Sequence, residues 1–175
     1  MAIECGDGRV VIGTDSFIGT YESKDSIDSP KVFRVGPIAI AYAGGMRVPQ
    51  LLQHTLKVPR YSEKNASLWT VSLAEQVRQL LVEHGAVGTS SEDGHTNAAE
   101  MLICVKGKVY LLQGDFAVFR MQRGYAAIGA GAPYALGSLY STQDLTDPVQ
   151  RVRMALRAAG QFSPSVSEPF YAVEV

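Results

Sequence analysis

Hydrophobic residues in the first forty positions fall in short stretches separated by Gly, Ser and Asp, a pattern typical of β-strands joined by turns. The sequence predicts strands at Arg9 to Asp15 and Lys31 to Val35, followed by the apolar stretch Ile38 to Ala43. The chain is therefore expected to begin with strands.

The spacing of hydrophobic residues then changes to steps of three and four, which predicts two helices. The first covers Met46 to Leu56 and must end before Pro59, because proline cannot continue a helix. The second runs from about Ser67 to Glu83 with one apolar stripe that begins at Trp69. Both helices are expected to pack one face against a sheet.

The second half of the chain repeats this order of strands followed by helices. Three strand-like stretches, expected to form a meander, are Glu100 to Val105, Val109 to Gln113 and Phe116 to Gln122. Pro133 and Pro148 occupy positions typical of a first helical turn, which predicts two further helices.

Three shorter features complete the pattern. Asp147 is a candidate N-cap for the helix that follows it. The alternating residues Phe170 to Val175 predict a final strand, and the Gly- and Ser-rich segment Gly85 to Asn97 predicts a surface loop. Helix pairs that follow groups of strands predict an α+β fold, with a four-layer αββα sandwich as the simplest arrangement and residues 1–175 as one domain.

Composition excludes several classes of protein. The chain has 175 residues, 46% of them hydrophobic, and a net charge of −1, which gives no field to attract nucleic acid. Its apolar stretches fall short of the ~20 residues of a transmembrane helix, and the N-terminus lacks the features of a secretory signal, so we expect a cytoplasmic protein. Cys5 and Cys104 lack metal-type spacing and are expected to be buried, reduced thiols.

Four segments, in matching order and spacing, resemble the proteasome β-subunit and bacterial HslV family of N-terminal-nucleophile (Ntn) hydrolases. They are VVIGTDS (Val10 to Ser16), SPKVFRV (Ser29 to Val35), AYAGGMR (Ala41 to Arg47) and AAIGAGAPYALGSLYS (Ala126 to Ser141). The resemblance implies a peptidase in which an N-terminal Thr, Ser or Cys attacks a peptide carbonyl, with its own α-amine as general base. An α-amine suits that role because its usual pKa, roughly 7.7 to 8.0, lies near neutral pH.

The same resemblance implies a role for individual residues. Asp15 and Lys31 match the Asp and Lys beside the nucleophile, and Gly44 matches the backbone amide that stabilises the oxyanion. Taken without this context, each has an ordinary structural explanation as a turn residue or a solvated charge. A substrate pocket beside the N-terminus is expected to be apolar and lined by three residues. They are Ile18, Tyr42 and Met46.

Three positions depart from the family pattern. Removal of Met1, expected before a residue as small as Ala2, leaves Ala2 at the candidate nucleophile position, and its methyl group cannot attack a carbonyl. Ala130 stands where a serine is usual, and Gln161 lies about where an aspartate is expected. A natural loss of activity and an engineered Thr-to-Ala change both explain Ala2. Cleavage before Cys5 is disfavoured because too little chain remains for the first hairpin.

Three functions are consistent with these observations, and one of them is an Ntn amidase that acts on a small molecule, because fold does not fix function. The other two follow more directly from the resemblance. The first is a subunit of a self-compartmentalising threonine-type peptidase, assembled as homo-oligomeric rings that act on peptides or unfolded proteins, with a possible ATP-dependent unfoldase as partner. The second is an inactive homologue that acts as a ring-forming scaffold. No cofactor or metal is implied, because His54, His84 and His95 lack acid or nucleophile partners at matched spacing.

Overall fold

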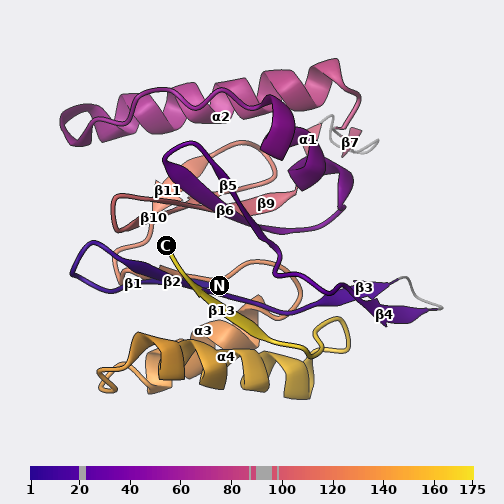
Figure 1. Ribbon diagram of the computed structural model, residues 1–175, viewed down its shortest axis with the longest axis vertical. Coiled ribbons are helices and arrows are strands. Elements are labelled where there is room, and N and C mark those ends of the chain that lie inside the picture. Colours follow the sequence, from indigo (N-terminus) through magenta and orange to yellow (C-terminus); the bar gives the residue numbers. More distant parts are fainter. Residues whose placement is uncertain (20–22, 87, 90–95, 98) are drawn as a thin grey trace.

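The computed structural model describes residues 1–19, 23–86, 88–89, 96–97 and 99–175 (Figure 1). Its helices are α1 (Arg47–Thr55), α2 (Ala66–Glu83), α3 (Ala132–Ser141) and α4 (Pro148–Phe162), and one 3₁₀ turn, Glu63–Asn65, precedes α2. Each predicted helix is present. The two with predicted bounds, α1 and α2, end within one residue of the expected positions, and Pro133 and Pro148 lie in the first turns of α3 and α4.

Two main sheets carry most of the strands. The first has the order β11-β10-β9-β6-β5 and contains β5 (Val32–Val35), β6 (Ile38–Ala43), β9 (Glu100–Val105), β10 (Lys108–Leu112) and β11 (Val118–Arg120). The second has the order β12-β1-β2-β13 and contains β1 (Ala2–Glu4), β2 (Val10–Thr14), β12 (Tyr125–Ala126) and β13 (Tyr171–Glu174). All pairs in both sheets are antiparallel.

Two small hairpins complete the described strands. They pair β3 (Phe17–Gly19) with β4 (Lys24–Ser26) and β7 (Gly88–Thr89) with β8 (Thr96–Asn97). The segment Gly85 to Asn97, predicted to be a loop without strands, therefore contains β7 and β8, and residues 87 and 90–95 lie outside the described residues.

Helices cover the outer face of each main sheet (Figure 1). One hydrophobic cluster joins α1 and α2 to the five-stranded sheet, including Leu52, Leu73 and Ile103. A second cluster joins α3 and α4 to the four-stranded sheet, and a third lies between the two sheets and includes Ile12 and Leu102. The α+β prediction is confirmed, because helices pack through the first two clusters on sheets whose strands are antiparallel.

A polar bridge ties the two sheets together at one end of β1. The Glu4 carboxylate on β1 accepts hydrogen bonds from the Arg120 guanidinium at 2.6 and 3.0 Å and from the backbone N–H of Val109 at 2.9 Å. Because Arg120 and Val109 belong to the other sheet, this carboxylate fixes how β1 lies relative to β10 and β11. The Arg120 hydrogen bonds help to hold the pKa of Glu4 below its usual value, although partial burial opposes them.

The N-cap predicted for α4 is present. The Asp147 side chain accepts a hydrogen bond from the backbone N–H of Val149 at 2.9 Å, and Pro148 occupies the first helical turn. We expect Asp147→Ala to lower the free energy of unfolding by about 1 kcal/mol, because one N–H at the helix start loses its acceptor. Urea denaturation measures this, with the exposed Asp144→Ala as control. Equal effects of both changes would contradict the capping role.

None of the described helices is long and apolar enough to cross a membrane.

Candidate active site

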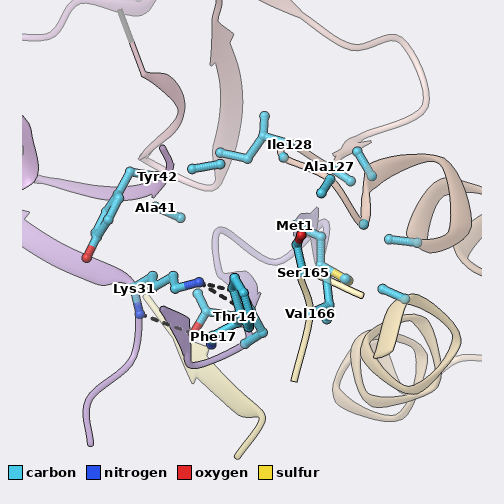
Figure 2. Close-up of a pocket in the computed structure, with 18 of the residues that line it drawn as sticks. Met1, Thr14, Phe17, Lys31, Ala41, Tyr42, Ala127, Ile128, Ser165 and Val166 are labelled. Atoms are coloured by element: carbon cyan, nitrogen blue, oxygen red, sulfur yellow. Dashed lines mark hydrogen bonds and ion pairs between the residues drawn. The ribbon is translucent and has the colours of Figure 1, made fainter. Parts of the chain in front are cut away.

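A cavity of about 590 Å³ opens between the ends of the two main sheets (Figure 2). Its walls come from Met1, the ends of β2 and β6, and the turn after α4. A further wall is the glycine-rich segment 127–132, which leads into the first residue of α3. These segments are far apart in the sequence, and their convergence makes this cavity the candidate site.

A lysine–carboxylate pair stands at one side of the cavity. The Lys31 ammonium lies 3.0 and 3.1 Å from the two carboxylate oxygens of Asp15, and both side chains are only 17% exposed. The backbone around the pair is also anchored, since Asp15 accepts from the N–H of Phe17 at 2.9 Å and Thr14 Oγ1 accepts from the N–H of Lys31 at 3.3 Å (Figure 2). The pair is therefore held in one geometry between β2 and the start of β5.

The N-terminal amine is buried at the same cavity. Met1 exchanges two backbone hydrogen bonds with Gly13, donating to its carbonyl at 3.0 Å and accepting from its N–H at 2.9 Å. Burial lowers the pKa of the amine from 8.0 to about 6, although the nearby negative charge of Asp15 favours the protonated form. The amine is consequently a neutral base at pH 7, able to accept a proton.

The side of the cavity near the Lys31–Asp15 pair also contains the three residues predicted to line an apolar substrate pocket. Ile18, Tyr42 and Met46 all border the cavity, and the Tyr42 hydroxyl lies 3.2 Å from the Met46 sulfur. Ile18 is 38% exposed at the rim. Burial raises the pKa of the Tyr42 hydroxyl, so it stays protonated near neutral pH.

Two glycines at the cavity allow the backbone to pack closely against neighbouring residues. Gly44, the candidate oxyanion donor, has a φ of +117°, and a Cβ added at this residue would lie only 3.2 Å from the Cβ of Ala99. Gly129 has a φ of +78° and would place a Cβ 2.9 Å from that of Ala43, while its N–H donates to Glu100 Oε2 at 3.1 Å. Side chains at either glycine would be strained in these conformations.

Asp15, Lys31, Gly44 and Ala130 all border the cavity. Ala2 does not. Side chains alternate along β1, so Met1 borders the cavity while Ala2 is fully buried between the sheets, in one cluster with Ile12 and Ala126. The expectation that the Ala2 side chain stands at the site is therefore corrected.

Gln161 also lies away from the cavity. The face of α4 that borders the cavity carries Leu156 and Ala159. Gln161 is two residues beyond Ala159, a rotation of about 200° along a helix, and its side chain is exposed. Ser165 and Val166, in the turn after α4, border the cavity instead.

Sequence reasoning missed Met1, Thr14 and Ser165. Met1 was treated as removed, and the three residues of β1 are too few to give a readable alternation. Thr14 falls inside a predicted strand, but only the register of the strands shows that its hydroxyl meets the backbone of Lys31. Ser165 lies in a turn without any sequence signal that would point to a site.

The histidines and cysteines of the part of the chain that the structure describes lie in ordinary structural surroundings. No group of three or more His, Cys, Asp or Glu side chains there could hold a metal ion. His84 Nδ1 lies 3.0 Å from the carbonyl of Leu80, and His95 is outside the described residues. Cys104 is buried as predicted, whereas Cys5 is only partly buried, and both are free thiols.

No protein-family model and no curated protein matches the sequence, but many solved structures match the fold. BPH from Thiobacillus denitrificans aligns with a TM-score of 0.82 and 21% identity over 99% of this chain and 95% of that chain. The chain has the fold of a proteasome-like subunit. HslV from Trypanosoma brucei aligns with a TM-score of 0.75 and 19% identity, covering 99% of this chain and 96% of that one.

The Anbu complex of Pseudomonas aeruginosa, described as a helical assembly, has the same proteasome-like fold. It aligns with a TM-score of 0.66 and 18% identity, over 99% of this chain and 79% of the other. The predicted resemblance to the proteasome and HslV is confirmed at the level of the fold. The cavity of this chain thus belongs to a proteasome-like fold that extends over nearly the whole sequence.

The buried amine predicts a pH-dependent stability in protein that retains Met1. Its pKa is about 6 in the folded state and 8.0 in the unfolded chain, so the unfolded state binds more protons between these values. The free energy of unfolding should therefore be highest above pH 8 and fall by about 2 to 3 kcal/mol as the pH drops to 6. Urea denaturation from pH 5.5 to 8.5 tests this, with intact mass as proof that Met1 is present. An N-acetylated chain with the same slope would contradict it.

Proposed function

We propose that this chain is a subunit of a self-compartmentalising peptidase of the N-terminal-nucleophile type. The observation that carries the proposal is the Lys31–Asp15 pair in the same cavity as a buried, neutral α-amine. The proteasome-like fold supports it. In this proposal, residues 1–175 form one domain, and the helices and sheets are the four layers of the αββα sandwich of the Ntn hydrolases.

The cavity contains groups suited to acyl transfer. A neutral amine can take the proton of an N-terminal hydroxyl as its oxygen attacks a peptide carbonyl, and can then return that proton to the leaving amine. The Lys31 ammonium would stabilise the hydroxyl oxygen as it loses its proton, and the N–H of Gly44 would stabilise the oxyanion. Water would then hydrolyse the ester and release the second product. The apolar wall of Ile18, Tyr42 and Met46 favours hydrophobic substrate side chains.

The proposed assembly is a homo-oligomeric ring that encloses these sites. Peptides or unfolded polypeptides are the proposed substrates, and an ATP-dependent unfoldase is a proposed partner, with the cytoplasm as the place of action. The assembly described for Anbu of Pseudomonas aeruginosa supports a multimeric arrangement in proteins of this fold.

A second candidate function is favoured by one specific observation. The residue at the cavity is Met1, and neither Met1 nor Ala2 carries a hydroxyl or thiol that could attack a carbonyl. A ring-forming scaffold without turnover would keep the fold and lose the nucleophile. In that case Ala130, which borders the cavity, would be a further change that accompanied the loss of activity.

Peptide turnover separates the two functions. The chain beginning at Met1 is assayed with fluorogenic peptides beside variants with threonine as first residue, including Met1→Thr and a chain that begins at position 2 with Ala2→Thr. Turnover by a threonine variant supports the peptidase. Rings that form in light scattering without turnover from any threonine variant favour the scaffold.

A further inference from the structure

A hydrogen bond to Glu100 joins the two main sheets at the cavity. Glu100 Oε2 accepts from the backbone N–H of Gly129 at 3.1 Å. Glu100 is the first residue of β9 in the five-stranded sheet, whereas Gly129 lies in the segment that leads from β12 of the four-stranded sheet into α3. The hydrogen bond therefore crosses from one sheet to a segment that continues the other.

The position of Glu100 on β9 explains why its side chain reaches the other sheet. Side chains alternate along a strand, and Leu102 and Cys104 of β9 lie in the hydrophobic cluster between the two sheets. Glu100 is two residues ahead of Leu102, so its carboxylate faces the same layer. Glu100 thus ends an otherwise apolar row of side chains on the inner face of β9.

The first residues of β9 also contact the turn that carries the candidate oxyanion donor. Glu100 pairs with Ala43 as the last rung between β6 and β9, and Ala99 lies beside Gly44. Gly129 approaches the same place, because a Cβ added there would lie 2.9 Å from the Cβ of Ala43. The start of β9 therefore holds the Gly44 turn and the Gly129 segment next to one another.

The position of Gly129 is passed on to the rest of the glycine-rich wall. The Gly129 carbonyl accepts a hydrogen bond at 3.0 Å from the N–H of Ala132, the first residue of α3. Gly129 and Ala130 both border the cavity. Because Gly129 has no side chain to pack, its N–H, its carbonyl and its contact with Ala43 determine where this wall lies.

A second carboxylate bridges the sheets at the opposite end of the same layer. Glu4 accepts from the N–H of Val109, which pairs with Cys104 near the far end of β9. It also accepts two hydrogen bonds from Arg120. Among the described residues, the Glu4 bridge thus has three recorded hydrogen bonds, whereas the Glu100 side chain has one at the cavity.

We propose that Glu100 is a positioning residue, which aligns the groups that the two sheets contribute to the cavity. The inference rests on the proposed function, in which Lys31 and Gly44 act from the five-stranded sheet, whereas Asp15 and the N-terminal amine belong to the four-stranded sheet. Acyl transfer needs the reacting atoms about 3 to 3.5 Å apart, and a misplacement of ~1 Å can lower the rate about 100-fold. Glu100 acts through Gly129 and the Gly44 turn.

Three variants test this role, both in the chain that begins at Met1 and in any threonine-bearing variant that cleaves peptides. Glu100→Met keeps the length of the side chain but removes the oxygen that accepts the Gly129 N–H. Glu100→Gln retains an amide oxygen that can accept the same hydrogen bond. Glu4→Met is the matched control, because it breaks the bridge at the opposite end of the layer.

We expect Glu100→Met to lower kcat by about 10- to 100-fold and to change KM by less than about threefold, because the reacting groups move and the substrate contacts remain. Glu100→Gln should restore kcat. Glu4→Met should lower the melting temperature by at least about 2 to 4 °C and leave kcat unchanged. Equal losses of kcat in Glu100→Met and Glu4→Met, or no rescue by Glu100→Gln, would overturn the positioning role.

Hydrogen–deuterium exchange followed by mass spectrometry tests the same role without turnover. Glu100→Met should speed amide exchange by at least about threefold in residues 43–46 as well as in 127–132, because both segments lose a common support. Glu4→Met should leave exchange in both segments unchanged. Parental exchange rates in residues 43–46 of Glu100→Met would overturn the proposal, since the Gly44 turn would then be independent of Glu100.

The two proposals fail in different ways. If no threonine-bearing variant cleaves peptides, faster exchange in both segments of Glu100→Met retains Glu100 as the link between them and counts against the peptidase. Turnover that Glu100→Met leaves unchanged retains the peptidase and overturns the positioning role.

Discussion

Lys31→Met should lower peptide turnover by at least about 100-fold in any threonine-bearing variant that cleaves peptides. The Lys31 side chain is 17% exposed, and its position is set both by the Asp15 carboxylate and by the hydrogen bond from the Lys31 backbone N–H to Thr14. Methionine keeps the length and apolar stem of the side chain but has no charge to stabilise an alkoxide. Steady-state rates with a fluorogenic peptide measure the loss.

The control for this change is Lys24→Met, which alters an exposed lysine on β4. Circular dichroism and the size of any oligomer should be unchanged in both variants, because methionine fits the space of the lysine stem. Turnover that survives Lys31→Met would show that the Lys31–Asp15 pair is structural. Asp15→Asn combined with Lys31→Met completes the comparison, since a pair retained for structure alone is often replaceable by neutral side chains at little cost in stability.

Trp69→Ala should lower the free energy of unfolding by about 3 to 5 kcal/mol, a large fraction of the usual stability of a domain. The indole is 4% exposed, and its N–H donates to the carbonyl of Pro59 at 2.9 Å. Its ring meets Tyr61 edge-on at 4.9 Å and Tyr110 at 5.9 Å between centroids. Alanine leaves a cavity between α2 and the five-stranded sheet and an unsatisfied carbonyl.

Urea denaturation of Trp69→Ala should give a lower midpoint with an unchanged slope. Leu68→Ala is the matched control on the same helix, because Leu68 is 67% exposed and its loss should change the free energy of unfolding by less than about 0.5 kcal/mol. Similar effects of the two changes would mean that α2 does not pack through the Trp69 face.

The sequence predicts long, periodic elements well and short ones poorly. Helix α2 has eighteen residues, enough for its apolar stripe to repeat several times, and its predicted start differs from the observed one by a single residue. Strands β1 and β12 have three residues and two residues and were not predicted. Their structure depends on partners distant in the sequence, and local propensity carries no information about those partners.

The candidate site divides in the same way. Asp15, Lys31 and Gly44 were named because they lie in segments of recognisable sequence, and they border one cavity. The Ala2 and Gln161 assignments depended on counting residues along the chain. Counting fails here because the face on which a side chain lies is set by the register of β1 and by the rotation of α4.

Strand β2 lies between the two ends of the chain, and this affects the order in which the protein can fold during synthesis. All five strands of the larger sheet lie within residues 32–120, so that sheet can form before translation ends. Among the described strands, only β13, residues 171–174, covers the edge of β2 that faces away from β1, and Val10 and Val175 exchange backbone hydrogen bonds. During synthesis, one edge of β2 therefore stays unpaired until residues 171–174 leave the ribosome. In that interval the exposed edge of this strand, which is buried in the folded protein, can pair with a strand of another nascent chain.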